Sequence, residues 1–377
     1  MKKIKVATIV GTRPEIIRLS AVIKLLEEHV EHKLIHTGQN YDYELNQIFF
    51  DELQLRAPDY YLGIDTSSLG RMLGETLIKI EPILIDEKPD AVLILGDTNA
   101  SIAAIMAKRL KIPIYHMEAG NRSFDFNIPE EINRRIIDHV ADFNLVYTEN
   151  SRRHLLAEGI QHRHIYVTGS PMYEVLQQHM VKINASEIVR KLTLEPQKFF
   201  LVSVHREENV DNPLNLRKVV AILNSLAETY GMPVIVSTHP RTRKRLEEAD
   251  GLVVDPLIQF LKPFGFLDYN CLQMNAKCVV SDSGTICEES SILNFPAVTI
   301  RQAIERPEAM DYGTIVLTGL EADIVLDSIR LVIHEFESFG GYRRICPEYQ
   351  IANTSWRVLK LMLGTAHLSN RWSGIEK

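Results

Sequence analysis

The sequence lacks the marks of several common classes of protein. Its formal net charge of −7 argues against broad binding to nucleic acid, which needs a basic surface. Its four cysteines form no Cys-x-x-Cys pair, so neither a zinc site nor a disulfide framework is indicated. No apolar run reaches the roughly 18 residues of a membrane helix. No Gly-x-Gly-x-x-Gly motif and no phosphate-binding P-loop follow the first predicted strand, so a tight dinucleotide or ATP site has no support.

These absences predict a soluble cytoplasmic protein with neither a membrane nor a nucleic acid as partner. The chain runs from its first residues directly into a predicted strand, without a signal peptide. Its 377 residues, 45% of them hydrophobic and 24% charged, suffice for one large core or two ordinary ones. An anionic ligand of this acidic chain would need a local basic pocket.

Short apolar runs alternate with longer amphipathic stretches along the whole chain. Strands are predicted at residues 5–10, 33–37, 91–95, 112–116, 143–147, 165–168, 199–204, 233–238, 253–254, 278–280 and 297–300. Helices are predicted between them, at residues 16–28, 71–85, 100–110, 153–158 and 288–293. This alternation predicts an α/β fold of two doubly wound, Rossmann-like parallel sheets facing a cleft. The first domain is expected over residues 1–170 and the second over 171–351, with 172–196 as the hinge.

Polar motifs follow the predicted strands at the ends where ligands of such sheets bind. They lie at residues 11–15, 96–98, 116–120, 205–209 and 238–241. Ligands of doubly wound sheets sit beyond the carboxyl ends of the strands. One such motif is ordinary loop chemistry, but five together predict a single active site.

The segment from residue 281 to 290 is predicted to pass from a buried strand into a helix. Ser283, Gly284 and Thr285 would expose backbone N–H groups at the helix N-terminus, where an anion is favoured. Glu289, about one helical turn further on, would reach a neutral diol such as a ribose. The pattern suits a nucleotide diphosphate. The alternative is a capped loop of an α/β domain.

Three cations are predicted at strand ends, where they would face this anion site. Arg13 follows the first strand, and His239 and Arg241 follow a strand of the second domain. A guanidinium is a fixed cation suited to phosphate. The alternative for each is a solvated surface charge.

Three carboxylates, Asp97, Glu118 and Glu130, are predicted in three different loops of the first domain. Carboxylates gathered in a partly dry cleft have separated pKa values, which assigns acid and base roles. The alternative is that Glu118 and Glu130 are structural partners of Arg122 and Arg134, and Glu130 also fits a helix N-terminus. His205 is either a strand-end histidine with satisfied hydrogen bonds or a proton donor that also stabilises a leaving group.

Together these residues resemble one known family, the non-hydrolysing UDP-N-acetylglucosamine 2-epimerases. The shared motifs occur in that family's order, at residues 11–15, 96–98, 118–120, 129–134, 205–209, 281–284 and 305–308. The resemblance implies a fold of the glycosyltransferase-B type, a homodimer, and inversion at C2 of a UDP-linked 2-acetamido sugar. It also implies that the C-terminal helix, 352–377, packs back on the first domain; the alternative is a helix confined to the second.

Several departures from the common pattern resemble one branch of the family. Arg18 stands where the enzymes acting on UDP-N-acetylglucosamine usually carry a lysine, and Thr285 replaces the second glycine of their Ser-Gly-Gly. The segments at 40–46, 170–175, 293–296 and 300–303 are similar to the branch that makes UDP-N-acetyl-L-fucosamine. That branch epimerises UDP-2-acetamido-2,6-dideoxy-L-talose for capsule or O-antigen assembly. The alternative is UDP-N-acetylglucosamine, giving UDP-N-acetylmannosamine.

The implied chemistry explains the residue types. C2 of a 2-acetamido sugar has no adjacent ketone, so its direct deprotonation would be prohibitively slow. Anti elimination of UDP across C1–C2 gives a 2-acetamidoglycal, and re-addition with protonation from the opposite face gives the epimer. This needs acid–base groups near both faces of C2 and cations around a diphosphate that stays bound. It needs neither a metal nor a redox cofactor.

The residues and the resemblance together predict the site. Proton transfer is assigned to Asp97, Glu118 and Glu130, with His205 assisting the diphosphate or a proton. Phe266 and Tyr269 would lie near uracil, although on composition alone each belongs to the core. The predicted substrate-binding residues are Arg13, Arg18, Arg134, His239, Arg241, Phe266, Tyr269, Ser283, Gly284, Thr285, Glu289 and Arg306.

Two alternatives belong to other functional classes. A glycosyltransferase of the same fold would transfer the sugar to an acceptor, and a nucleotide-sugar sensor would bind without catalysis. The three carboxylates, and the lack of a basic or apolar membrane-facing segment, favour the epimerase.

Overall fold

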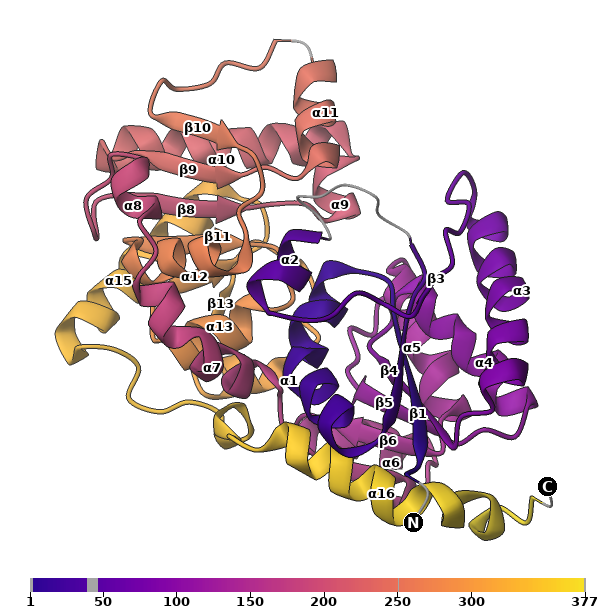
Figure 1. Ribbon diagram of the computed structural model, residues 1–377. Helices are drawn as coiled ribbons and strands as arrows, with labels where there is room; N and C mark the ends of the chain where they lie inside the picture. Colours follow the sequence, from indigo (N-terminus) through magenta and orange to yellow (C-terminus); the bar gives the residue numbers. More distant parts are fainter. Residues whose placement is uncertain (1–2, 39–46, 250, 376–377) are drawn as a thin grey trace. The chain divides into compact units, whose positions relative to one another are not determined.

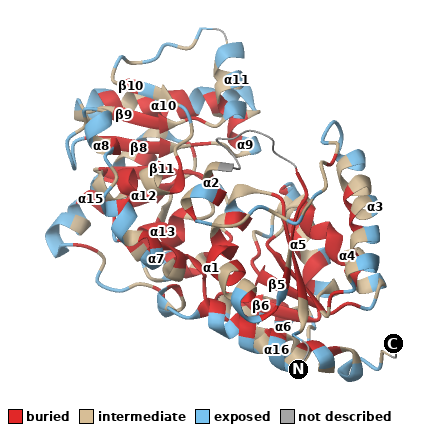
Figure 2. Ribbon diagram, in the orientation of Figure 1, coloured by how far each residue is buried: buried red, intermediate tan, exposed pale blue. Residues whose placement is uncertain are grey.

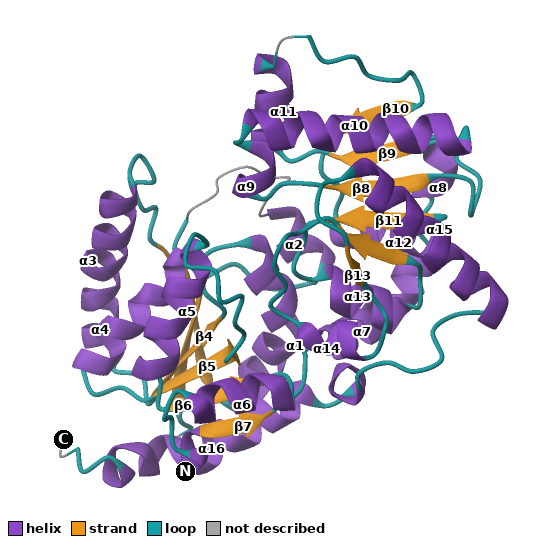
Figure 3. Ribbon diagram, turned by 180° about the vertical axis from the view of Figure 1, so that it is seen from behind, coloured by secondary structure: helices purple, strands orange, loops and turns teal. Residues whose placement is uncertain are grey.

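The computed structural model describes residues 3–38, 47–249 and 251–375, which form two compact units (Figure 1). The first unit comprises Met1–Gln178 and Pro347–Lys377, and the second comprises His179–Cys346. Each unit contains one parallel sheet with helices packed on it (Figure 3). The predicted α/β fold with two Rossmann-like sheets is confirmed.

The first sheet has the strand order β3-β2-β1-β4-β5-β6-β7. All five residues of β4 are buried, as expected for a parallel strand covered on both faces. The strands are β1 (Lys5–Val10), β2 (Glu31–His36), β3 (Tyr60–Tyr61), β4 (Ala91–Leu95), β5 (Ile114–Ala119), β6 (Phe143–Val146) and β7 (Ile165–Val167).

Most helices of the first unit are amphipathic connections between these strands. They are α1 (Arg13–His29), α2 (Gln47–Glu52), α3 (Leu69–Glu87), α4 (Ala103–Arg109), α5 (Pro129–Val140), α6 (Glu149–Ala157) and α16 (Thr354–Trp372). Three short 3-10 helices are η2 (Asn99–Ile102), η3 (His162–His164) and η4 (Pro347–Gln350). In the described parts of the chain, no helix is long and apolar enough to cross a membrane.

The second sheet has the strand order β10-β9-β8-β11-β12-β13. Its strands are β8 (Phe200–Ser203), β9 (Val234–Ser237), β10 (Ile258–Leu261), β11 (Cys278–Ser281), β12 (Ala297–Thr299) and β13 (Val316–Leu317). The helices are α8 (Ile188–Lys191), α9 (Glu207–Val210), α10 (Pro213–Tyr230), α11 (Pro240–Glu248), α12 (Phe266–Asn275), α13 (Ile286–Leu293), α14 (Pro307–Asp311) and α15 (Ala322–Phe339).

The core of the second unit lies between its sheet and the helices α10 and α15, which pack against each other. Val202 and Val280 from the sheet belong to the same buried cluster as Leu223 of α10 and Ile329 of α15. Figure 2 shows β8 and β11 largely in the colour of buried residues. Burying one such side chain stabilises the fold by about 2 kcal/mol. The core therefore fixes the strands whose ends carry the polar motifs.

Helix α16 is part of the first unit. The hydroxyl of Thr354 donates to the carbonyl of Thr168 (3.1 Å), and the hydroxyls of Tyr115 and Thr365 are 2.6 Å apart. The same helix packs along α1. The C-terminal residues thus return to the sheet formed by the first part of the chain.

The chain passes between the units twice, first within a helix and again between Cys346 and Pro347. Helix α7 (Met172–Asn184) contains the boundary at Gln178, whereas the expected boundary lay ahead of it, after residue 170. Its first turns stay with the first unit because the carboxylate of Glu174 accepts the backbone N–H of Ser355 in α16 (2.9 Å). The side chain of Glu174 thus links α7 to α16 within the first unit.

The predicted strand at residues 253–254 is wrong. These valines are exposed and lie in an irregular segment, and the strand of this region is β10, a few residues later. The side-chain amide of Asn224 hydrogen-bonds the backbone groups there. It donates to the carbonyl of Val253 (2.8 Å) and accepts from the N–H of Asp255 (2.9 Å). The two-residue strands β3 and β13 were not predicted, because so short a run has no visible period.

Glu87, the last residue of α3, ties three strands together. Its carboxylate accepts from the hydroxyl of Tyr60 in β3 (2.6 Å) and pairs with Lys5 in β1 (2.9 Å) and Lys33 in β2 (3.2 Å). The hydrogen bond from Tyr60, followed by that from Lys5, lowers the pKa of Glu87 to about 2. A carboxylate with a lowered pKa stabilises the fold above its ordinary pKa, and this contribution is lost as the pH falls.

We therefore expect Glu87→Gln to make thermal stability less sensitive to acid. Between pH 6 and pH 3, the drop in Tm should be smaller by about 3 °C than in the wild type, allowing for solvent screening. Scanning calorimetry at both pH values measures it. Glu81→Gln, at an exposed position of the same helix, is the matched control and should leave the drop unchanged. An identical drop in all three proteins would contradict this role of Glu87.

Candidate active site

In each sheet the strand order reverses at one point. The first sheet reverses between β1 and β4, and the second between β8 and β11. Ligands of such sheets bind outside the carboxyl ends of the strands at this point. The predicted motifs at 11–15 and 96–98 follow β1 and β4, and those at 205–209 and 281–284 lie at the ends of β8 and β11. Both reversal points thus carry predicted site residues.

Glu15 joins the ends of β1 and β4. Its buried carboxylate accepts the backbone N–H groups of Gly11 (2.8 Å) and Thr12 (2.7 Å), and the hydroxyl of Thr98 (2.8 Å). Burial raises the pKa of Glu15, while the hydrogen bonds from Gly11, Thr98 and Thr12 act in the opposite direction. One side chain therefore fixes both loops at this reversal point. The sequence identified Glu15 only as part of a motif.

Arg13 begins α1 beside this carboxylate. It is half-buried, and its guanidinium carbon lies 5.6 Å from the centre of the Phe49 ring in α2. Such a contact restrains the guanidinium at the carboxyl end of β1.

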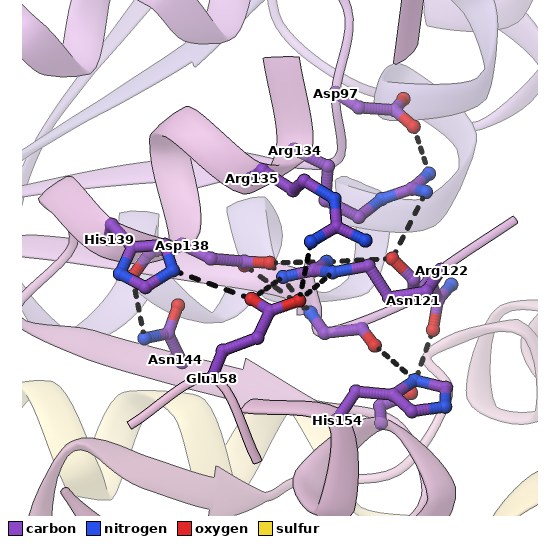
Figure 4. Close-up of polar contacts among 12 residues, drawn as sticks. Asp97, Asn121, Arg122, Arg134, Arg135, Asp138, His139, Asn144, His154 and Glu158 are labelled. Atoms are coloured by element: carbon purple, nitrogen blue, oxygen red, sulfur yellow. Dashed lines mark hydrogen bonds and ion pairs between the residues drawn. The ribbon is translucent and has the colours of Figure 1, made fainter. Parts of the chain in front are cut away.

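Asp97 is half-buried at the end of β4 and pairs with Arg134 of α5 (Figure 4). Its backbone carbonyl accepts from the amide of Asn133 (2.9 Å), also in α5. The Arg134 side chain is only 2% exposed, so its position is fixed by packing. Helix α5 thereby sets both the backbone and the carboxylate of Asp97.

Glu118 lies within β5, whereas the sequence placed it in a loop after the strand. Its φ of +64° is in the left-handed region, at a register irregularity between Met117 and Ala119. A non-glycine residue there costs about 1 kcal/mol and requires support from its surroundings. Its carboxylate pairs with Arg18 of α1, and both side chains are buried.

The carboxylates of Asp97 and Glu118 belong to neighbouring strands. A Cβ atom built at Gly96, the residue before Asp97, would lie 3.7 Å from Oε2 of Glu118. The Glu118 carboxylate therefore lies beside the backbone that leads into Asp97. The alternative interpretation paired Glu118 and Glu130 with Arg122 and Arg134. In the structure, Arg122 instead pairs with Asp138 (2.7 Å) and Glu158 (2.6 Å).

Glu130 lies in the first turn of α5 and is half-buried, as expected of an acid at a helix N-terminus. The prediction that the three carboxylates come from three different loops is therefore wrong, because Glu118 lies in β5 and Glu130 in α5. The next residue, Glu131, is fully buried: it accepts the N–H of Ser123 (2.8 Å) and pairs with Arg135 (2.8 Å). Glu131 holds the segment before α5, a role that the sequence did not indicate.

In the second unit, Asp282 holds the end of β8. Its carboxylate, fully buried, accepts the backbone N–H groups of His205 (3.1 Å) and Arg206 (3.0 Å) and the amide of Asn209 (3.0 Å). The ring nitrogen Nδ1 of His205 lies 3.3 Å from the same carboxylate. The ring is 30% exposed, so Asp282 orients a histidine that a ligand can reach.

The segment after β11 opens α13 as predicted. The hydroxyls of Ser283 and Thr285 are 2.9 Å apart, and the N–H of Ser283 donates to the hydroxyl of Ser281 (3.0 Å). All three residues from Ser283 to Thr285 are half-buried. Two hydroxyls and Gly284 therefore line the N-terminus of this helix.

Three arginines converge on Gly284. A Cβ atom built there would lie 2.9 Å from a guanidinium nitrogen of Arg306, 3.6 Å from one of Arg206 and 3.8 Å from one of Arg301. Arg306 donates to the carbonyl of Gly284, and Arg301 pairs with Glu305 (2.7 Å). Only Arg306 was predicted as a site residue. Arg206 and Arg301 occurred in quoted motifs, but no sequence pattern links positions so far apart.

The remaining predicted residues of the second unit divide between the interior and the surface. Glu289 is buried and accepts from the amide of Gln273 (2.7 Å). Phe266 is buried and Tyr269 half-buried, both in α12. His239 caps α11, its Nδ1 accepting the N–H of Arg241 (3.2 Å), and its ring centre lies 6.3 Å from that of His205.

Arg241 is exposed and lies among acids. It pairs with Glu207 (2.6 Å) and approaches Asp211 (3.7 Å). Its charge is therefore partly neutralised by two surface carboxylates, and its contact with a phosphate stays a prediction. Among the residues that carry the branch resemblance, the whole segment 40–46 lies outside the described part of the chain.

The family model described as UDP-N-acetylglucosamine 2-epimerase matches residues 24–363. The chain belongs to this family. A solved UDP-N-acetylglucosamine 2-epimerase from Rickettsia bellii is 46% identical, with 98% of each chain covered and a TM-score of 0.89. The enzyme of that name from Methanocaldococcus jannaschii, solved with UDP-N-acetylglucosamine and UDP, is 36% identical. That match covers 95% of this chain and 99% of the other, with a TM-score of 0.89.

The UDP-N-acetylglucosamine 2-epimerase family includes enzymes named for other sugars. The UDP-2,3-diacetamido-2,3-dideoxy-D-glucuronate 2-epimerase of Pseudomonas aeruginosa is 35% identical over 330 residues, covering 86% of this chain and 91% of that one. The resemblance found in the sequence is thus confirmed for the family, and the chain is an isomerase of UDP-sugars. Membership of this family favours the epimerase over the glycosyltransferase and sensor alternatives.

Proposed function

We propose that this epimerase converts UDP-2-acetamido-2,6-dideoxy-L-talose to UDP-N-acetyl-L-fucosamine, for capsule or O-antigen assembly. One observation carries the choice of substrate. Arg18, which stands where enzymes acting on UDP-N-acetylglucosamine usually have a lysine, pairs directly with the expected catalytic carboxylate Glu118. The residue that departs from the common pattern is thus in direct contact with a carboxylate that would act on the sugar.

The proposed reaction proceeds by elimination and re-addition. A carboxylate removes the proton from C2 as the C1–O bond breaks, leaving a C1–C2 double bond, UDP and a protonated base. UDP then returns to C1 while an acid on the opposite face protonates C2. Asp97, Glu118 and Glu130 supply the acid–base groups, and the fixed arginines Arg134 and Arg18 hold the first two in place. Each proton transfer of this kind contributes about 10²–10⁴-fold to the rate.

The second unit binds UDP in this proposal. The cluster of Arg206, Arg301 and Arg306 around Gly284 supports a diphosphate site, because three guanidinium groups and a helix N-terminus favour the same anion. Ser283 and Thr285 add hydroxyl donors. His205, held by Asp282, would stabilise the departing diphosphate.

The remaining contacts follow the same assignment. Glu289 would bind the ribose, and Phe266 and Tyr269 would lie near uracil. Arg13 would bind the substrate through its guanidinium. The half-buried guanidinium of Arg13 and the buried carboxylate of Glu289 support these roles, because both are already restrained by packing.

Isotope exchange tests the reaction. Incubation with the UDP-sugar alone in D₂O should place deuterium at C2 of the sugar, because the C2 proton is lost and replaced from solvent. NMR of the recovered nucleotide sugar measures it. Epimerisation without any solvent deuterium at C2, or no turnover of either candidate sugar, would contradict the proposal.

Replacing Asp97 by Asn should lower the exchange rate by at least about 10²-fold, the usual effect of losing a general acid or base. Asp90→Asn is a matched control at the opposite end of β4, where Asp90 accepts the N–H of Lys5 (2.8 Å). It should lower stability without lowering exchange. Near-wild-type exchange in folded variants at two of the three carboxylate positions would reject the assignment.

Replacing Glu289 by Ala should weaken UDP binding about tenfold, because a carboxylate hydrogen bond to the ribose is lost. Isothermal calorimetry with UDP measures the affinity. Ser290→Ala, at the next position of the same helix, is the control and should bind UDP as the wild type does. Equal affinity in all three proteins would remove Glu289 from the ribose site.

The substrate is decided by kcat/KM for the two UDP-sugars on one preparation. A methyl group at C6 suits a less polar pocket, which rejects an added hydroxyl only by roughly 10²-fold, so some activity on UDP-N-acetylglucosamine is expected. Arg18→Lys should lower the preference for the 6-deoxy sugar. Faster epimerisation of UDP-N-acetylglucosamine by the wild type would reject the L-talose substrate and favour the substrate in the relatives' names.

A homodimer is also part of the proposal. Exposed apolar side chains occur on α3 (Ile78 and Ile85) and on α5 (Ile132 and Ile136), and both helices pack on α4. Exposed apolar side chains of this kind would be covered by a second copy of the chain. Light scattering should give twice the chain mass of 43.0 kDa, and the mass of a single chain would contradict it.

A further inference from the structure

Behind the carboxylates of the first unit lies a buried pair that the proposed reaction does not use. Asp138, on α5, is 1% exposed, and His116, on β5, is fully buried. Nδ1 of His116 lies 3.0 Å from the Asp138 carboxylate. A buried carboxylate is costly unless it is paired and hydrogen-bonded, so the other contacts of these two residues decide what they do.

His116 connects the pair to Asp97. Its second ring nitrogen, Nε2, lies 2.8 Å from the backbone carbonyl of Gly96. A carbonyl only accepts hydrogen bonds, so Nε2 carries a hydrogen and donates a hydrogen bond to this carbonyl. Gly96 directly precedes Asp97, and the imidazole therefore fixes the peptide from which that carboxylate projects.

Asp138 also connects to Glu118. Its carboxylate accepts the backbone N–H of Gly120 (3.2 Å), two residues after Glu118. Glu118 occupies the left-handed region at the irregularity of β5, a conformation that persists only where the surroundings hold it. A hydrogen bond just beyond this irregularity restrains it.

We propose that Asp138 is a positioning residue for both carboxylates: through His116 it sets the backbone of Asp97, and through the N–H of Gly120 it sets the backbone of Glu118. The inference rests on the proposed proton-transfer roles of Asp97 and Glu118. Asp138 touches neither residue's side chain in this scheme and acts through the two backbone segments.

The charge of Asp138 is balanced by a connected network (Figure 4). Arg122 donates to Asp138 (2.7 Å), and its other nitrogens bond both oxygens of Glu158 (2.6 and 2.8 Å). Arg135 also reaches Glu158 (2.9 Å). Although burial alone would raise it, His116 and Arg122 hold the pKa of Asp138 below its usual range. Arg122, Glu158 and Arg135 thus hold the Asp138 carboxylate in a connected set of ion pairs, and such a set restrains its members, as a positioning element requires.

The position of Asp138 on its helix supports the same function. Arg134, one helical turn earlier on α5, pairs with the Asp97 carboxylate itself. One helix thus holds the Asp97 side chain through Arg134 and its backbone through Asp138 and His116. A small displacement of α5 would move both.

The first test is Asp138→Asn, which keeps the shape but leaves one acceptor oxygen in place of two. We expect kcat for C2 epimerisation to fall about 10- to 100-fold, as for a displacement of order 1 Å, with KM within about threefold and UDP affinity unchanged. A merely structural residue would lower the amount of folded enzyme without changing kcat per active site. Wild-type kcat per folded enzyme would overturn the proposal.

A pair of His116 variants tests the route to Asp97. In His116→Gln the amide nitrogen takes the place of Nε2 and keeps the donation to Gly96, whereas in His116→Asn it takes the place of Nδ1 and loses it. We expect kcat to be about tenfold higher in the Gln variant than in the Asn variant. Equal loss in both would overturn the proposal, even if Asp138→Asn does not fold.

Asp142→Asn is the matched control. Asp142 is also buried, but it accepts the N–H of Ile114 (3.0 Å) and so holds the opposite end of β5. It should lower Tm and leave kcat unchanged. A fall in kcat equal to that of Asp138→Asn would show a general effect of disturbing the strand and overturn the proposal.

Hydrogen exchange separates this inference from the proposed function. In Asp138→Asn, protection should be lost by more than about tenfold in peptides covering residues 96–98 and 118–121, and retained elsewhere in β4 and β5. This measurement needs no activity. Unchanged protection overturns the positioning role, whereas a wild-type enzyme without C2 exchange overturns the proposed function.

Discussion

The architecture of each reversal point depends on buried carboxylates that accept backbone N–H groups. Glu15 does this at the end of β1, and Asp282 at the end of β8. Loops at the carboxyl ends of parallel strands leave backbone donors without partners in the ladder, and an unbonded buried donor costs about 1–3 kcal/mol. A carboxylate satisfies several donors at once, with charge-assisted bonds. The loops that carry site residues are therefore fixed before any ligand binds.

Each buried carboxylate also requires compensation of its own charge. Asp138 has His116 and Arg122, and Glu118 has Arg18. Partners of this kind come from elements distant in sequence, so the charge pairs also lock helices to strand ends. The same acids and arginines therefore serve the stability of the sheet and the placement of the proposed acid–base groups.

The second unit gathers positive charge at one place, although the chain as a whole is acidic. The net charge is −7, yet Arg206, Arg301 and Arg306 meet at Gly284. Glu305 pairs with Arg301, and Glu288 lies 3.2 Å from Arg306, so the cluster is partly neutralised. A diphosphate would meet a preformed group of donors, and electrostatic stabilisation is strongest where donors need no reorganisation.

Local sequence determined much of this protein. Apolar runs bounded by polar turns located most of the strands, and the Ser-Gly-Thr segment located the start of α13, because both signals arise from residues adjacent in the chain. The same logic failed at Val253, where the amide of Asn224 bonds the backbone that a strand would have paired. A pattern within the segment contains no information about that partner.

Only the tertiary structure decided how the charged side chains pair. Arg18 lies 100 positions from Glu118, and Arg306 lies 22 positions from Gly284. In the sequence, Asp138 is one of several acids in a predicted amphipathic segment. In the structure, its carboxylate contacts His116 in β5 and Gly120 directly after that strand. The sequence determined which residue types stand at the strand ends, since chain order and hydrophobic period set the sheets. Their partners depend on distances that exist only after the helices have packed.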